Sequence, residues 1–223
     1  MAEYAVVKDN HLSFNGKNYF RGGSEDVELG SYGEKKSPIT QANYLEVQGK
    51  IPTPKLKVKE AVEVAIDFER TSEKEFLANI NVAGVFKGSA KTAYQDMKSQ
   101  KLRLVKLQVN NEDIKDAANQ SPKAIDDLIQ YGKDARIAHQ VFIVMEAESA
   151  KSFTTSTSFD VSVSAGVVKV TGEGRVGSSG QTTVTVSKGS IFAYGMVKLD
   201  WDANRAKNKT AIVKVTDDQW GLN

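Results

Sequence analysis

A thirteen-residue segment, 153–165, alternates strictly between two kinds of side chain. Every odd position is apolar or threonine, and every even position is polar. Because successive side chains of a β-strand point to opposite faces, this period of two predicts one long strand with a dry face and a wet face. The predicted dry face consists of Phe153, Thr155, Thr157, Phe159, Val161, Val163 and Ala165.

Two earlier segments, 56–68 and 80–94, show the same period and are also predicted to be long strands. A helix is the alternative for 56–68, because Val58, Ala61 and Ala65 recur at helical spacing. That alternative depends on alanines, whereas the density of β-branched residues favours the strand. The apolar parity of 56–68 is Leu56, Val58, Val62, Val64, Ile66 and Phe68, and that of 80–94 is Ile80, Val82, Phe86 and Tyr94.

Local capping and turn signals predict the remaining elements. Ser72 followed by Glu75 is a capping box, and Ser121-Pro122 places proline at the first position of a helix. Asn15-Gly16 is the best hairpin turn in the chain. We expect short helices near residues 72–78, 111–118 and 122–131, and further strands at 4–7, 11–14, 18–20, 101–109, 138–145, 167–170, 181–186, 191–199 and 211–215.

This pattern predicts a single α+β domain, in which a twisted, mostly antiparallel sheet with long strands carries a few short helices. Residues 1–55 are expected to form a β-hairpin-like and extended N-terminal region. Residues 56–199 form the central sheet, and 200–223 a C-terminal strand and tail. Within this order, residues 34–59 are rich in lysine and contain three prolines, so we expect a basic, extended connection there.

Charge balance and residue usage narrow the function classes. Thirty Lys and Arg against 28 Asp and Glu give a net charge of +2, which argues against nucleic-acid binding. The absence of cysteine removes thiolate metal ligands and thiol nucleophiles, and two histidines leave little for a metal centre. We therefore expect no enzymatic activity, no cofactor and no metal. The N-terminus lacks a secretion signal and no apolar run reaches about 18 residues, which predicts a cytoplasmic protein.

Three features that suggest chemistry have simpler explanations. The glycine-rich stretch 172–180 matches neither nucleotide-binding pattern and lies between strands, which favours a turn. His11 and His139 are far apart, and neither has a carboxylate grouping around it. The paired acids Asp217 and Asp218 have no metal-ligand spacing.

Two segments carry a resemblance to a known family. The first is VFIVMEAESAKSF at 141–153, and the second is GEGRVGSSGQTTVTVSKGSIFAYGMVKL at 172–199. Together they resemble the pore-forming N-terminal domain of gasdermins. In that family an apolar strand leads into a long alternating hairpin, a glycine-rich GEG turn and a TVT-x-P-x-GS stretch, to which residues 183–194 are similar. The similarity is clearest over residues 141–199, and the first 55 residues do not take part in it.

The resemblance implies a latent pore-forming protein that inserts two amphipathic β-hairpins into a membrane and forms a homo-oligomer when active. It also implies an unidentified inhibitory partner and a move from the cytoplasm to the membrane on activation. A membrane strand needs about 9 to 11 alternating residues, a length that the three long segments reach. The side chains expected to face lipid are Phe159, Val161, Val163, Val62, Val64 and Ile66.

The lysines of residues 34–59 are the candidate contacts with an anionic membrane, because juxtamembrane basic residues are attracted to anionic lipid. They are Lys35, Lys36, Lys50, Lys55, Lys57 and Lys59. The alternating strands also suit a different class of protein, since any antiparallel sheet with one wet face shows the same alternation. The alternative function is a structural or assembly subunit, such as a component of a bacterial or phage particle, with no membrane activity.

Overall fold

The computed structural model describes residues 3–52, 56–79, 89–156, 158–164, 167–173, 181–186, 189–202 and 211–221. It is a mixed α+β domain made mostly of strands. The strands are β1 (Glu3–Val7), β2 (His11–Phe14), β3 (Lys17–Phe20), β4 (Ser31–Lys36), β5 (Tyr44–Lys50), β6 (Val58–Ile66), β7 (Leu102–Val109), β8 (Ala135–Glu146), β9 (Ser158–Ser164), β10 (Val167–Glu173), β11 (Gln181–Val186), β12 (Ile191–Trp201) and β13 (Ile212–Asp218). The helices are η1 (Ser24–Asp26), α1 (Glu73–Leu77), α2 (Ala90–Lys98), α3 (Asn111–Asn119), α4 (Pro122–Tyr131), η3 (Gly132–Asp134) and α5 (Ala147–Thr154).

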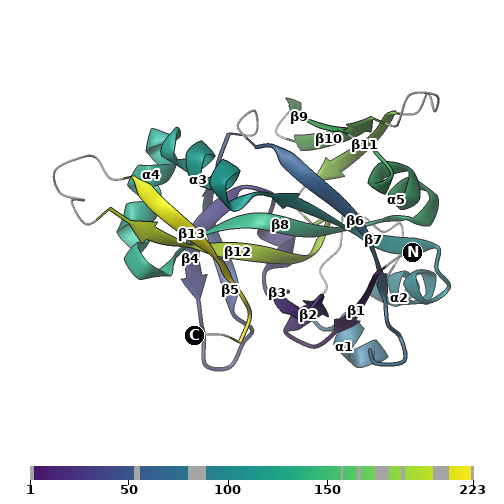
Figure 1. The fold of residues 1–223 in the computed structure, drawn as a ribbon. Helices are drawn as coiled ribbons and strands as arrows, with labels where there is room; N and C mark the ends of the chain where they lie inside the picture. Colours follow the sequence, from purple (N-terminus) through teal and green to yellow (C-terminus); the bar gives the residue numbers. More distant parts are fainter. Residues whose placement is uncertain are drawn as a thin grey trace.

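Ten strands form one sheet in the order β13-β12-β3-β2-β1-β6-β7-β8-β4-β5. An additional pairing of β12 with β8 closes seven of them into a barrel. The named strands pair antiparallel, as predicted, except for the parallel pair β1 and β6. Figure 1 shows β12 and β8 crossing the centre of the molecule, with β13, β4 and β5 extending the sheet beyond the barrel.

The hairpin of β2 and β3 confirms the Asn15-Gly16 prediction. Both turn residues have positive φ, 49° at Asn15 and 73° at Gly16. A two-residue turn of this kind requires positive φ at both positions, which Asn and Gly adopt at low cost. The turn fixes the register, with Leu12 opposite Tyr19.

The barrel interior is an apolar core. It holds Ala5, Val7, Leu12, Phe14, Tyr19, Val64, Ile66, Leu104, Phe142, Val144 and Phe192, all buried. Phe76 of α1 packs against Phe192, and Tyr94 of α2 packs against Phe76, with ring centroids 5.4 and 5.3 Å apart. The two helices therefore add their aromatic side chains to the barrel core.

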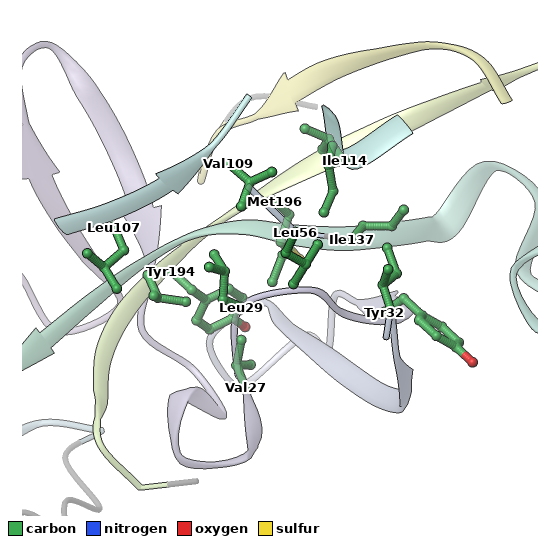
Figure 2. Packing of buried hydrophobic residues seen from close by; sticks show 14 of the residues in the cluster. Val27, Leu29, Tyr32, Leu56, Leu107, Val109, Ile114, Ile137, Tyr194 and Met196 are labelled. Carbon is green, nitrogen blue, oxygen red and sulfur yellow. The ribbon is translucent and has the colours of Figure 1, made fainter. Parts of the chain in front are cut away.

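A second core lies on the other side of β7, β8 and β12. Figure 2 shows Val27 and Leu29, from the segment before β4, beside Tyr194 of β12, with Leu56 and Ile137 close by. Buried Ile114, Ala124 and Leu128 belong to the same cluster and come from α3 and α4. This second core packs β4, β5 and β13, which lie outside the barrel, against the barrel strands β7, β8 and β12.

The helices expected at 72–78, 111–118 and 122–131 are confirmed by α1, α3 and α4. The capping box is present, with the Ser72 side chain accepting from the Glu75 N–H and the Glu75 side chain accepting from the Ser72 N–H. Pro122 occupies the first turn of α4.

Two predictions of strand are wrong in part. Residues 90–94 belong to helix α2, because Ser89 caps the Thr92 N–H and because Ala93, Tyr94 and Met97 form a buried helical face; residues 80–88 lie outside the described residues. Residues 153 and 154 end helix α5, so the strand expected at 153–165 begins only at Ser158. For 56–68, the strand is confirmed as β6 and the helical alternative is wrong.

The segment 34–59 is not a connection. It contains the end of β4 and all of β5, which pair antiparallel with each other. Four of its lysines, Lys35, Lys36, Lys50 and Lys59, form ion pairs with carboxylates of the folded chain. Both outer edges of the ten-stranded sheet are covered in places: Gly22 bridges Tyr44 of β5, and the Asn119 side chain exchanges two hydrogen bonds with the backbone of Ile212 of β13. Covered edges resist pairing with other chains.

Candidate functional site

Strands β9, β10 and β11 form a separate antiparallel sheet that carries the segment singled out by the sequence. Val161 pairs with Val170, and Val170 pairs with Val184, so apolar side chains share one face across all three strands. Thr171 and Thr183 lie on the opposite face, with their hydroxyl oxygens 3.1 Å apart. In Figure 1 this small sheet lies apart from the barrel strands, with α5 beside it.

Helix α5 covers the apolar face of this sheet. Its Phe153 is fully buried and packs against Phe159 of β9, with ring centroids 5.2 Å apart. Val168, Val170, Val184 and Val186 are buried in the same cluster as Phe153 and the outer barrel residue Leu107. The small sheet therefore shares the second core, which lies on the other side of β7 and β8 from the barrel interior.

Gly172 permits the close approach of α5 to β10. A Cβ atom at this position would lie 2.4 Å from Oγ and 2.9 Å from Cβ of Ser156, and 3.2 Å from the Phe153 ring. These distances are shorter than van der Waals contact. A side chain here would push the end of α5 away from the sheet.

The structure does not bring the predicted lipid-facing residues together. Phe159 and Val161 are half-buried against the shared core. Val64 and Ile66 lie inside the barrel, where Val64 is fully buried, and Val62 is half-buried against the same core. The side chain of Val163 lies outside the described residues. The apolar residues of β6 and of β9 thus belong to two different cores.

The predicted lipid-binding lysines mostly have carboxylate partners. Lys35 Nζ lies 3.1 Å from Oδ2 of Asp218, and Arg136 Nε lies 2.5 Å from the same oxygen. Lys36 pairs with Glu34 and Glu46, Lys50 with Glu28, and Lys59 with Asp113 at 3.6 Å. Lys57 is exposed, and Lys55 lies outside the described residues. Exposed pairs of this kind contribute about 0 to 1 kcal/mol, so a lipid phosphate can compete for those lysines but not readily for buried Lys35.

Polar residues beside the barrel form a group that the sequence analysis missed. Asp217 on β13 lies 2.6 Å from Lys17 Nζ, accepts from Asn111 Nδ2 at 3.2 Å, and lies 3.6 Å from Nε2 of His139. Lys17 lowers the pKa of the Asp217 carboxyl against the opposing effect of burial. Nothing in the local sequence signals this group, because its members come from four separate elements.

Lys106 is buried, and no carboxylate of the described residues forms an ion pair with it. Its Nζ donates to Oε1 of Gln108 at 2.9 Å and lies 5.9 Å from the centre of the Tyr19 ring. Burial lowers the pKa of the Lys106 amine, with Glu60 acting in the opposite direction.

In the described part of the chain, no three His, Cys, Asp or Glu side chains gather in a way that could hold a metal ion. None of the helices among those residues combines the length and the apolarity needed to cross a bilayer. Comparison of the chain with protein families, curated proteins and solved structures gives no match.

Proposed function

We propose that this chain is a latent pore-forming protein whose membrane-inserting element is the sheet of β9, β10 and β11, lengthened by the end of α5. The observation that carries the proposal is the continuity of pattern between α5 and β9. Phe153 and Thr155 have the same parity as Phe159 and Val161, so the apolar face of β9 would continue back to Phe153 if this part of the chain were extended. The resemblance of residues 141–199 to gasdermins supports the same function.

The length of the strand supports a change of conformation on insertion. Strand β9 has seven residues, fewer than the roughly 9 to 11 that a membrane strand needs. If the last turn of α5 unwound and the chain from residue 153 onward joined β9, the strand would run from 153 to 164 and reach that length. In the helix, Phe153 is buried through its three-residue spacing from Ala150. Phe153 is therefore buried as part of the helix and would lie on the apolar face of the lengthened strand.

One inserting sheet replaces the two hairpins expected from the sequence. Insertion of β6 would open the closed barrel and expose the aromatic core around Phe142 and Phe192. Release of the small sheet exposes one apolar face and leaves the barrel pairing intact. We propose that the edges of β9 and β11 join neighbouring copies in the oligomer, and that exposed Lys151 and Lys169 meet anionic lipid together with Lys57.

A disulfide across α5 and β10 tests the conformational change, because the chain contains no cysteine of its own. A Cβ on Gly172 lies 2.9 Å from Ser156 Cβ, so Ser156→Cys with Gly172→Cys needs a shift of about 0.6 Å to reach disulfide geometry. Gly172 is opposite Phe159 in the present register. In a lengthened β9, Ser156 would be three positions away from Gly172, so the bond excludes that state.

The measurement is dye release from vesicles of phosphatidylcholine and phosphatidylglycerol, at pH 7 and at about pH 5, where protonation weakens the fold. We expect release by the wild type and by the reduced double variant, and none by the oxidised double variant. Wild type with and without reductant is the matched control. Absence of release by the wild type at both pH values overturns pore formation, and equal release by the oxidised variant overturns the lengthening of β9.

The second candidate is a non-enzymatic assembly subunit, and the edges of the small sheet favour it. Among the described strands, β9 and β11 each pair with β10 and with no other. An unpaired edge is a template for strand addition. Concentration-dependent self-association in solution by analytical ultracentrifugation, without any dye release, would favour assembly over pore formation.

A further inference from the structure

Four loops converge on a hollow of about 480 Å³ that the small sheet does not touch. This volume lies within the range of small-molecule sites. Binding residues often lie on such loops, held by a rigid scaffold. The lining comes from the β1–β2 turn, the segment after β3, the connection into β5 with the first residue of that strand, and the second residue after α1. It consists of Asn10, Gly22, Gly23, Ile39, Thr40, Gln41, Ala42, Tyr44 and Asn79.

The lining of this hollow carries hydrogen-bonding groups but no charged side chain. Three amides come from Asn10, Gln41 and Asn79, and each amide both donates and accepts. Asn79 Nδ2 donates to the Asp9 carbonyl at 2.7 Å, which fixes the orientation of that amide. Asn79 also has a φ of 53°, a conformation that non-glycine residues seldom adopt. Amide groups without a charged neighbour in the lining can exchange hydrogen bonds with the hydroxyl groups of a neutral ligand.

The same hollow is also lined by apolar side chains. Ile39 is fully exposed, at 102%, and lies in the lining of the hollow. Tyr44 is half-buried and also lines the hollow, with Gly23 beside it. A saccharide is amphipathic in the same way, with hydroxyl groups at its edges and a C–H face that packs on aromatic and aliphatic side chains.

A second hollow of about 490 Å³ adjoins the first and shares Gly23, Gln41 and Tyr44 with it. Glu25, Asp26 and Glu46 contribute three carboxylates to its lining, and Lys36 pairs with one of them, Glu46. Their negative charge disfavours an anionic ligand in the shared space, by like-charge repulsion. The pair of hollows therefore selects against acidic sugars.

We propose that the hollow around Tyr44 binds a neutral saccharide of one or two rings, free or as the headgroup of a glycolipid. The site is separate from the sheet of β9, β10 and β11, so it stands whether or not the chain forms pores. Bound sugar would cover Ile39 and accept and donate hydrogen bonds through Gln41 and Asn79.

The first measurement is a titration of the full chain, followed by amide chemical shifts, with lactose, cellobiose, maltose and chitobiose up to about 50 mM. Digalacturonate is the acidic comparison. We expect saturable shifts confined to residues 10, 22–23, 39–44 and 79 for at least one neutral sugar. No saturable shift with any of the four sugars, or equally strong binding of digalacturonate, overturns the proposal.

Substitutions place the binding in the hollow. Asn79→Gly keeps the positive φ and removes the amide, and Gln41→Ala removes an exposed amide shared by both hollows. Each should weaken the affinity about fivefold, as expected for the loss of one neutral hydrogen bond. The matched control is Asn15→Gly, the same substitution at a residue with a φ of 49° in a turn outside the hollow, which should leave the affinity unchanged. Unchanged affinity in both test variants contradicts the site.

Co-sedimentation with phosphatidylcholine vesicles, with and without lactosylceramide, distinguishes the two sources of the sugar. Binding only to the vesicles that contain glycolipid, with loss in Asn79→Gly, assigns the site to a headgroup. Shifts with free lactose alone assign it to a soluble sugar.

Discussion

The indole of Trp220 stacks on the imidazole of His11, with ring centroids 4.3 Å apart and ring planes 16° from parallel. The backbone N–H of Trp220 donates to the Asn18 carbonyl at 3.1 Å. These contacts hold the chain after β13 against the hairpin of β2 and β3. The C-terminal segment is thus part of the fold and not a detachable tail, since Ile212 and Val215 of β13 are also buried.

Trp220→Ala should therefore lower the free energy of unfolding by about 1 to 3 kcal/mol, because it removes the stacked ring and its buried area. Trp220→Phe keeps a ring over His11 and should lose less. Urea denaturation of the two variants measures the difference. Equal stability of Trp220→Ala and the wild type would show that the stacking does not hold the segment.

Arg21 is completely buried, and its guanidinium donates to the backbone carbonyls of Lys8, Glu75, Phe76 and Ala78. The planar fork supplies donors that a lysine cannot reproduce. Burial lowers the pKa of Arg21 to about 10, which leaves it charged at neutral pH. The side chain thereby joins the β1–β2 turn to the end of α1.

Arg21→Lys should destabilise the protein by about 3 kcal/mol or more, because several buried carbonyls lose their partner. The matched control is Arg70→Lys at an exposed position, which should change stability by less than about 0.5 kcal/mol. Thermal melting followed by circular dichroism compares the two. A similar melting temperature for both variants would contradict the structural role of Arg21.

Stability should fall in mild acid because of His139. This imidazole is 1% exposed, and burial lowers its pKa from 6.5 to about 4, against the opposing effect of Asp217. Between these two pH values the unfolded chain binds more protons than the folded chain. The free energy of unfolding is then highest above pH 6.5 and falls as the pH drops toward 4, by up to about 3 kcal/mol.

Denaturation with urea at several pH values between about 7 and 4 measures this dependence. His139→Gln should flatten the curve, because the glutamine does not titrate. His11→Gln is the control at the other histidine, which is half-buried and should keep most of the slope. A wild-type curve that is flat across this range would contradict the buried, neutral state of His139.

The parts of the fold predicted correctly depend on local signals. Asn15-Gly16 specified its turn, and Ser121-Pro122 specified the start of α4, because each acts through its own backbone. The closing of the barrel could not be predicted in this way, since it depends on pairing between β8 and β12, which are distant in sequence. Alternation also misassigned Phe153, because its helical contact with the small sheet depends on tertiary packing.

In the candidate sites, too, features set by neighbouring residues were predicted and features set by distant contacts were not. The amphipathic face of β9 followed from the spacing of Phe159 and Val161 alone. Lys35 pairs with Asp218, which is 183 positions away in the sequence. The sequence alone does not reveal this partner, so Lys35 was predicted to contact anionic lipid. The hollow around Tyr44 had no sequence signal, since its four loops meet only in the folded chain.

The last prediction compares two neighbouring residues on β9. Val161 is half-buried against the shared core, whereas Ser162 is exposed. In the proposed inserted state Val161 faces lipid and Ser162 faces water, so Val161→Lys should cost about 2 to 4 kcal/mol near the midplane and abolish dye release. Ser162→Lys adds the same charge on the wet face and should leave both the fold and the release unchanged. Melting temperature must be measured beside release, because Val161→Lys also places a charge against the core of the folded protein. Loss of release at a temperature where Val161→Lys remains folded supports insertion of this face, and equal release by the two lysine variants contradicts it.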